Sequence, residues 1–179
     1  MMSEHDFFSE ITGSTNDLTY AVQALRASGQ PFCLIGGLAV NQYADPMVTL
    51  DADFAIAASE GAPEALKAAG FIVEAFPHSL NAALPGSRLR IQITLDARYR
   101  DFPARAVAGV VFGVAMPVAC LADVVQGKVW AASDTTGRAS KRSKDRTDLI
   151  RLAETNPEVC AMVPVGMIPE VDDLRGQNS

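Results

Sequence analysis

The sequence has few of the residues that build disulfide frameworks or zinc sites. Its 179 residues include only three cysteines and two histidines. Cys33, Cys120 and Cys160 are far apart and stand in apolar surroundings, a pattern typical of reduced core thiols. With His5 and His78 as the only histidines, a zinc site of the Cys/His type is not expected.

The sequence also lacks long apolar runs. None of its apolar stretches approaches the roughly 20 residues that cross a bilayer as a helix. Residues 1–14 are acidic and have neither the basic part nor the apolar part of a signal peptide. We therefore expect a cytoplasmic protein that does not enter a membrane.

Positive charge is scarce overall but concentrated in one segment. The formal net charge of −6 argues against bulk attraction to nucleic acid. One short stretch nevertheless contains five basic residues and a single acidic one, Asp145. A patch of this kind could bind a triphosphate or a short piece of RNA backbone, or it could be a solvated loop and helix start. The five basic residues are Arg138, Lys141, Arg142, Lys144 and Arg146.

The remaining patterns predict an α+β protein with a mixed β-sheet flanked by helices. Nearly half the residues are apolar and a fifth are charged, as in ordinary globular domains. Ser14 or Thr15 is the expected cap of the first helix, which ends near Ser28. Apolar runs and alternating segments predict strands at 31–35, 48–57, 71–76 and 87–97, with one or two more within 104–119. Further helices are expected at 38–44, 63–70, 121–133 and 143–154.

These patterns divide the chain into four parts. Residues 1–30 form an N-terminal helical segment, residues 31–119 the core sheet, and residues 120–155 two helices of the same domain. Residues 156–179 contain Pro157, Pro164 and Pro169 and end in a polar stretch. They are expected to form an irregular tail.

Two carboxylates, Asp51 and Asp53, stand one residue apart inside an apolar strand. Residues two apart in a strand share a face, so both side chains point the same way, with roughly 6–7 Å between their Cα atoms. Ionised carboxylates so close together repel one another and resist desolvation. Such a pair is expected to hold a cation, although a solvent-facing strand is the simpler explanation when the pair is taken alone.

A third carboxylate, Asp96, has the same alternation on its own strand. Its apolar neighbours Ile93 and Leu95 alternate with it, so Asp96 is expected on the polar face. If the two strands are neighbours, Asp51, Asp53 and Asp96 converge above one face of the sheet. Divalent ions such as Mg²⁺ favour oxygen ligands, and a pair of them can clamp the attacking and leaving oxygens of a phosphoryl transfer.

Two glycines follow the strand that precedes these aspartates. Gly36 and Gly37 close an apolar strand and open a short helix, where free N–H groups and a missing Cβ allow phosphate oxygens to approach. A tight turn between strand and helix would also explain them. No Gly-Lys-Ser/Thr follows, so the segment is not a Walker loop.

The ordered set of motifs resembles the nucleotidyltransferase superfamily typified by DNA polymerase beta and the minimal nucleotidyltransferases. The set comprises a strand, "GG" and a helix, then "TLDADF", then a later strand ending in "LD". Downstream, "LADVVQGKVWAAS" and "KRSKDRTDLIRL" look like the continuation in the AbiEii-type branch. The match runs from about Cys33 to Leu152 and implies a nucleotidyltransferase-like mixed sheet with a short C-terminal helical part.

The resemblance implies a role for each matching residue. Asp51, Asp53 and Asp96 would bind catalytic Mg²⁺, two ions in number, and Asp96 would also help to deprotonate the acceptor hydroxyl. Lys128 would contact the triphosphate and stabilise the leaving pyrophosphate. The nucleotide-binding residues would be Gly36, Gly37, Thr49, Lys128, Arg142, Lys144 and Asp145.

One position departs from the pattern. This branch often has an arginine two residues before the threonine, where this chain has Met47, while Thr49 stays. Two functions follow as expectations. The first is a Mg²⁺-dependent nucleotidyltransferase that moves a nucleoside monophosphate from a nucleoside triphosphate (NTP) to an acceptor hydroxyl on a tRNA end, a protein side chain or a small molecule. The second is an inactive protein of the same fold that works by binding, for instance beside a cognate antitoxin in a toxin–antitoxin pair.

Overall fold

The computed structural model describes residues 16–177. It confirms an α+β fold with one seven-stranded mixed sheet in the order β3-β4-β5-β2-β1-β7-β6. Two neighbouring pairs, β2 with β5 and β1 with β7, are parallel, and the other pairs are antiparallel. The strands are β1 Phe32–Ile35, β2 Asp51–Ile56, β3 Ile72–Phe76, β4 Ser79–Ala83, β5 Arg90–Thr94, β6 Val107–Val111 and β7 Val114–Val118.

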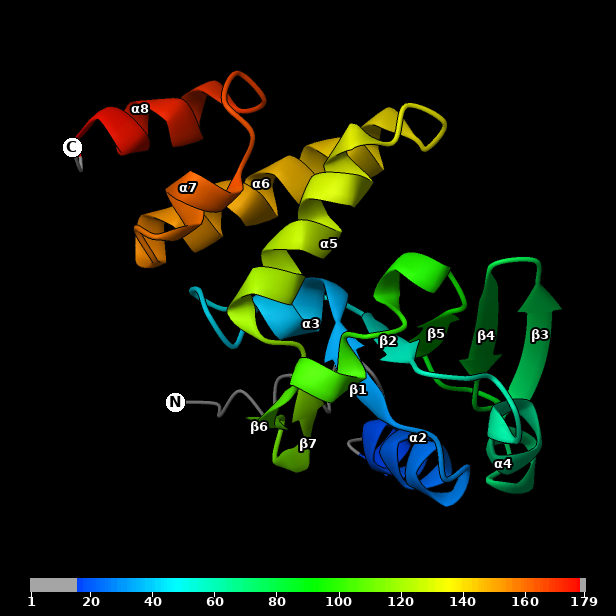
Figure 1. The fold of residues 1–179 in the computed structure, drawn as a ribbon. Helices are drawn as coiled ribbons and strands as arrows, with labels where there is room; N and C mark the ends of the chain where they lie inside the picture. The colour runs from blue at the N-terminus through cyan, green and yellow to red at the C-terminus, as the bar shows by residue number, and fades with distance from the viewer. Residues whose placement is uncertain (1–15, 178–179) are drawn as a thin grey trace.

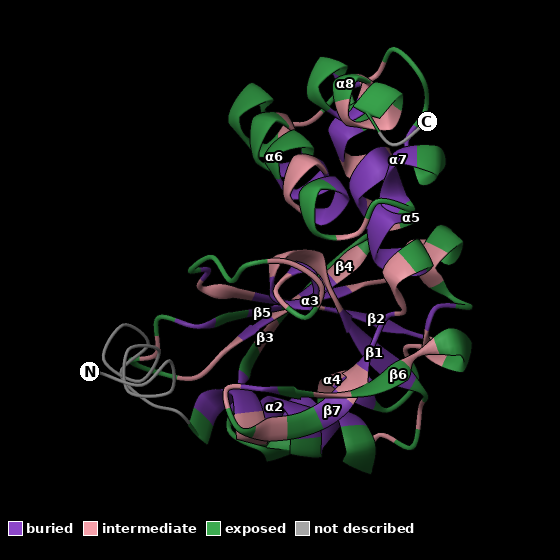
Figure 2. Ribbon diagram, turned by 90° about the vertical axis from the view of Figure 1, so that its left-hand side faces the viewer, coloured by how far each residue is buried: buried purple, intermediate pink, exposed green. Residues whose placement is uncertain are grey.

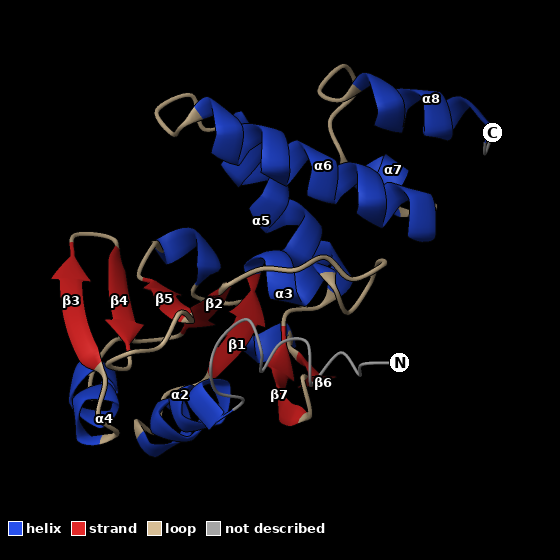
Figure 3. Ribbon diagram, turned by 180° about the vertical axis from the view of Figure 1, so that it is seen from behind, coloured by secondary structure: helices blue, strands red, loops and turns tan. Residues whose placement is uncertain are grey.

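The helices lie on both sides of this sheet. Helices α2 and α4 pack on one side, and α3, α5 and α6 lie on the other, as Figures 1 and 3 show. None of the described helices is long and apolar enough to cross a membrane. The helices are α2 Asn16–Ala27, α3 Gly36–Val40, α4 Ala62–Ala68, α5 Leu121–Ser133, α6 Ala139–Thr155, α7 Val159–Met162 and α8 Pro169–Gln177, with short 3-10 turns η1 Ala97–Tyr99 and η2 Pro103–Arg105.

The alternation predicted for the central strands is present in the structure. In β2, Ala52 and Phe54 are fully buried, while Asp51 and Asp53 on the other face are half-buried. Strand β5 alternates in the same way, with Ile91 buried between exposed neighbours. Because α2 and α4 cover the apolar face, the polar face of β2 and β5 is left for the functional side chains. The expected helix caps at Ser14 and Thr15 lie outside the described residues.

The C-terminal segment differs from the irregular tail expected from its prolines. Helices α7 and α8 occupy most of it, and Val159, Ile168 and Val171 are buried (Figure 2). Pro169 is the first residue of α8, a position where proline is tolerated because no intrahelical N–H bond is lost there. Pro169 therefore marks where α8 begins, and the buried aliphatic side chains provide the stabilisation that a loose tail would lack.

Candidate functional site

Asp53 lies against the glycine pair at the start of α3. It is paired with Ile35 across β1 and β2, so the chain turns into Gly36 directly beside its carboxylate. Gly36 has a φ of +69°, and a Cβ at this position would overlap Oδ2 of Asp53 and lie 2.9 Å from its Cβ. Only glycine fits here without strain. The missing side chain at this turn therefore leaves the room that the Asp53 carboxylate occupies.

Asp53 has no direct ion pair among residues 16–177. Burial raises its pKa from 3.8 to about 6, and the neighbouring charge of Asp51 adds to the rise, while Lys128, Lys141 and Lys144 oppose it. A charged group that is desolvated without a direct ion pair favours its neutral form. The folded protein therefore holds a proton at Asp53 more tightly than the unfolded chain does.

This shift predicts a pH-dependent gain in stability for Asp53→Asn. Because the folded pKa is raised, the ionised side chain destabilises the fold above about pH 6, by the order of 1–3 kcal/mol. In metal-free buffer, we expect the variant to exceed the wild type by that amount near pH 8. The gain should shrink as the pH falls through 6 toward 4. Urea unfolding at several pH values measures it, and Asp101→Asn, at an exposed position, is the control. A gain independent of pH would contradict the interpretation.

Asp51 has a basic partner on the neighbouring strand. Asp51 and Arg90 face each other across the parallel pair β2 and β5, and Arg90 Nε lies 2.7 Å from Asp51 Oδ1. The Arg90 side chain is 73% exposed, so it can leave this pair at little cost. Thr49 is buried, and its hydroxyl accepts a hydrogen bond from the N–H of Asp51 at 3.3 Å. Thr49 therefore orients the start of β2.

Asp96 does not complete the three-carboxylate site expected from the sequence. Strand β5 ends at Thr94, and Asp96 instead caps the 3-10 turn η1 by accepting a hydrogen bond from the N–H of Arg98. Its carboxylate also binds the Arg98 guanidinium, at 2.7 Å, and this hydrogen bonding lowers the pKa of Asp96. Among residues 16–177, no three Asp, Glu, His or Cys side chains are grouped so that they could hold a metal ion. The expected clustering of Asp51, Asp53 and Asp96 is therefore wrong for this structure.

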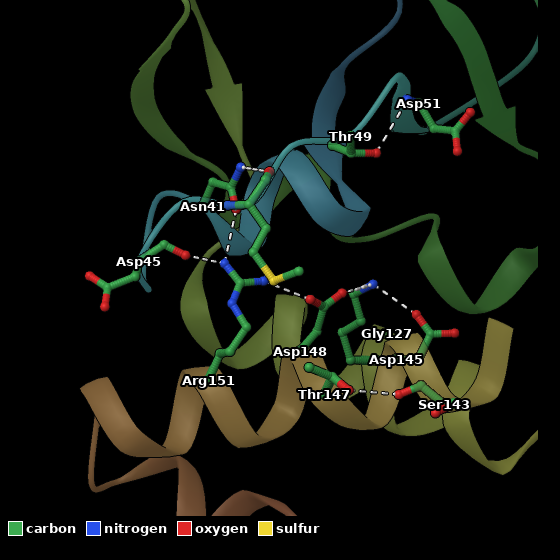
Figure 4. A network of polar contacts seen from close by, with 12 residues as sticks. Asn41, Asp45, Thr49, Asp51, Gly127, Ser143, Asp145, Thr147, Asp148 and Arg151 are labelled. Atoms are coloured by element: carbon green, nitrogen blue, oxygen red, sulfur yellow. Dashed lines mark hydrogen bonds and ion pairs between the residues drawn. The ribbon is translucent and has the colours of Figure 1, made fainter. Parts of the chain in front are cut away.

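Lys128 of α5 lies between two buried carboxylates of α6. Its Nζ lies 2.8 Å from Asp145 Oδ1 and 2.7 Å from Asp148 Oδ2. Burial lowers the pKa of Lys128, but Asp148 and Asp145 more than offset this, so the pKa lies above its ordinary value. Lys128 is therefore a permanent cation. Figure 4 shows Asp145 and Asp148 on one helix, side by side.

Arg151 extends this network to the loop before β2. It binds Asp148 at 2.7 Å, and it donates hydrogen bonds to Asn41 Oδ1 and to the carbonyl of Asp45, as Figure 4 shows. Asn41 in turn exchanges two hydrogen bonds with the backbone of Met47. The side chain of Met47 is half exposed. Asn41 thus fixes the backbone at this unusual position.

Two cavities adjoin at Asp53. The larger, of about 770 Å³, lies between the sheet face and the corner that joins α5 to α6, where Arg138, Lys141 and Lys144 are basic. The smaller, of about 270 Å³, extends past Gly36 toward Asp96 and Trp130. Both are lined by Asp53, Gln92, Lys128, Lys141 and Asp145.

The structure brings most of the residues predicted from the sequence to these two cavities. Gly37, Asp51 and Lys144 line the larger one, while Gly36, Asp96 and Arg142 line the smaller. Thr49 lies beneath Gly37, 3.6 Å from where a Cβ would stand. Nearby residues that were not predicted as site residues are Arg90, Gln92, Arg98, Lys141 and Arg151.

Trp130 does not offer a free ring for stacking. Phe102 stacks on it at 5.9 Å with an interplanar angle of 18°, and the Arg98 guanidinium lies 5.0 Å from its ring centroid. Tyr99 packs edge-on at 5.2 Å. This aromatic cluster therefore supports the wall of the smaller cavity, and Trp130 has the anchoring role of a core residue.

Comparison with known proteins identifies the fold. No protein-family model matches the chain, and no curated protein matches it by sequence. Solved structures do resemble it, and three of them are similar along most of their length. The antibiotic-resistance factor ANT(2'')-Ia has 14% identity and a TM-score of 0.54, with 90% of this chain and 88% of that one covered. The lincosamide antibiotic adenylyltransferase LnuA, bound to lincomycin, has 12% identity and a TM-score of 0.52, with 78% and 98% covered.

The third is an antigenic nucleotidyltransferase-like protein from Paracoccidioides brasiliensis, with 14% identity and a TM-score of 0.54. The alignment covers 90% of this chain and 85% of that one. Sequence identities of 12–14% show that the fold is shared, and they do not show which reaction the chain catalyses. The chain therefore has the fold of the nucleotidyltransferases.

Proposed function

We propose that this protein transfers a nucleoside monophosphate from an NTP to an acceptor hydroxyl and releases pyrophosphate. The observation that carries the proposal is the position of Asp53, a carboxylate with a raised pKa against Gly36, at the junction of two cavities. A site that joins two substrates needs two spaces that meet at one reactive point. The AbiEii-type branch and a cytoplasmic location remain part of the proposal.

The carboxylate pair fits a Mg²⁺ ion. Asp51 and Asp53 present oxygen ligands on one face of β2, and Mg²⁺ is commonly bound by one or two carboxylates together with substrate phosphates. A bound ion would polarise the phosphoryl oxygens and neutralise their developing charge. Asp51 would exchange its exposed partner Arg90 for the ion. Of the three predicted metal ligands, Asp51 and Asp53 therefore remain candidates, and Asp96 does not.

Basic residues around the larger cavity would bind the triphosphate. Lys141 and Lys144 lie on the first turns of α6, and Arg138 precedes it; all three line the cavity. Lys128, held as a cation by Asp145 and Asp148, would stabilise charge on the leaving pyrophosphate. Gly36 and Gly37, having no side chains, leave room for phosphate oxygens beside Asp53. Arg142 would support this corner through its bond to the carbonyl of Gly137.

The reaction is a substitution at the α-phosphorus. The acceptor hydroxyl oxygen forms a bond to this phosphorus, the bond to the bridging oxygen breaks, and the hydroxyl proton passes to solvent. Residues of the site contribute by positioning and by charge. A tRNA end is one candidate acceptor, because segment 138–146 is basic. A protein side chain or a small molecule is another, because the net charge of the whole chain is −6.

Label transfer tests the proposal. The protein is incubated with each α-³²P-labelled NTP, Mg²⁺ and separate pools of tRNA, protein and small hydroxylated molecules. We expect label on one acceptor class, and a loss of at least 10³-fold in Asp53→Asn, because the transition-state charge would lose its ligand. Ser79→Ala, outside both cavities, is the matched control. Transfer that survives in Asp53→Asn would falsify the assignment of this residue.

A second function rests on two particular observations. Met47 stands where the resembling branch often has an arginine, and Asp51 is already neutralised by Arg90. Both features suit a protein that keeps the fold but works by binding a partner, such as a cognate antitoxin. Calorimetry with ATP, CTP, GTP and UTP, with and without Mg²⁺, separates the two functions: the enzyme requires metal-dependent nucleotide binding, and the binding protein does not.

A further inference from the structure

A row of polar side chains crosses the sheet away from Asp53. The strand register pairs Asp53 with Gln92, Gln92 with Asn81, and Asn81 with Glu74, on β2, β5, β4 and β3 in turn. All four line the larger cavity. With neighbouring strands about 4.8 Å apart, the row spans roughly 14 Å, from the reactive carboxylate to the edge strand.

This row and the basic corner line the same cavity. Arg138, Lys141 and Lys144 come from the α5–α6 corner, whereas Gln92, Asn81 and Glu74 come from the sheet. Figure 1 shows the turn of the β3–β4 hairpin on the same side of the molecule as the loop that joins α5 to α6. A ligand in this cavity therefore meets cations from the helical corner and neutral amides, ending in one carboxylate, from the sheet.

The side chains of this polar row can recognise the hydrogen-bonding groups of a ligand. Asn and Gln each carry a donor and an acceptor, and Glu74 is an acceptor when ionised. The Oδ1 atom of Asn81 is buried and has no hydrogen-bond partner among the described residues. An unpaired buried acceptor costs about 1–3 kcal/mol, and a turn of the Asn81 side chain toward the cavity would relieve this cost by letting Oδ1 accept a hydrogen bond from a ligand.

Apolar surface accompanies this row. Ile72 is 62% exposed on β3, although it is a large aliphatic residue, and together with Ala83 it lines the same cavity. A planar ring could rest on these two side chains while its edge faces the amides. Phosphates on the basic wall, a ring on the aliphatic surface and hydrogen bonds at the ring edge together describe a nucleotide.

We propose that Gln92, Asn81 and Glu74 bind the base of the NTP and select bases that carry an exocyclic amino group. This assignment rests on the proposed function, because it takes the triphosphate to lie beside Asp53. An amino group donates to the acceptors Asn81 Oδ1 and Glu74, whereas a carbonyl at the same place would meet them with a lone pair. Bases with the amino group are therefore favoured over their oxo counterparts.

Binding measurements with matched ligands test this assignment. ATP is compared with inosine triphosphate, and CTP with UTP, since each pair differs chiefly by an amino group replaced by an oxygen. Inorganic tripolyphosphate measures the phosphate contribution alone. Each ligand is titrated with Mg²⁺ into the wild type, Asn81→Ala, Glu74→Gln and the control Ser79→Ala, which changes β4 outside the cavity. Melting temperatures verify that the variants fold, and Glu74, being exposed, tolerates substitution best.

We expect the wild type to bind the amino member of at least one pair at least tenfold more tightly than its oxo counterpart. Asn81→Ala and Glu74→Gln should bring this ratio near one while leaving tripolyphosphate affinity within about twofold. An unchanged ratio overturns the assignment but leaves the proposed function standing. If the variants bind NTPs normally yet transfer label slowly at saturating NTP, the row belongs to the acceptor and the assignment is overturned. If the wild type binds neither NTP nor tripolyphosphate, the proposed function itself fails.

Discussion

Replacing Lys128 by methionine should lower the free energy of unfolding by about 3–5 kcal/mol. Lys128 is 7% exposed and binds Asp145 and Asp148, which are themselves buried. Methionine keeps much of the volume but removes the ion pair of Asp145 and leaves Asp148 with Arg151. Removing one partner from a buried ion cluster is costly because the remaining charge stays desolvated. Urea unfolding at neutral pH gives the difference directly.

Two comparisons make this experiment specific to the buried network. Lys67→Met removes an exposed lysine from α4, and its effect should stay within about 0.5 kcal/mol. The double variant Lys128→Met, Asp148→Asn should recover part of the loss, because it removes one of the buried carboxylate charges. A loss below 1 kcal/mol in Lys128→Met would mean that water reaches these carboxylates. The ion pairs of Lys128 would then not stabilise the folded chain.

Alanine at position 36 should damage the site far more than alanine at position 29. Gly36 and Gly29 have nearly the same φ, +69° and +73°, so both substitutions carry a similar conformational cost, about 1–2 kcal/mol. They differ in their surroundings. A Cβ on residue 36 overlaps the Asp53 carboxylate, whereas nothing lies within 4 Å of a Cβ on residue 29.

The excess effect of Gly36→Ala therefore measures the displacement of Asp53. We expect nucleotidyl transfer to fall by about 10²-fold or more in Gly36→Ala, since small misplacements of reacting groups are this costly. Gly29→Ala should keep transfer within about twofold of the wild type while losing comparable stability. Label-transfer rates and urea unfolding on the same preparations give both quantities. Equal transfer rates in the two variants would contradict a role for the contact between Gly36 and Asp53.

Sequence reasoning succeeded where structure follows from local rules. The alternation of a strand decides which side chains share a face, so the common orientation of Asp51 and Asp53 could be predicted from two-residue spacing. The glycine pair likewise indicated a tight turn between a strand and a helix, and the chain passes from β1 into α3 there. Both inferences needed only the residues of one segment, and the structure contains both features.

The features that were not predicted from the sequence depend on contacts between distant segments. Nothing local indicates that the strand with Arg90 runs parallel to β2 and sets Arg90 opposite Asp51. Asp96 was taken as the end of the strand, whereas hydrogen bonds from Arg98 bend the chain into a 3-10 turn there. Helix α7 packs against α5 and α6, and α8 packs against α6 and α7. The positions of the prolines do not reveal these contacts.

The contacts of Arg151 have a mechanical consequence for the whole molecule. One guanidinium joins helix α6 to Asn41 and Asp45, and through Asn41 to the backbone of Met47, four residues before Asp51. A displacement of α6 relative to the sheet would therefore be transmitted through Arg151 and Asn41 to the segment that leads into β2. The position of Asp51 is in this way connected to the position of α6.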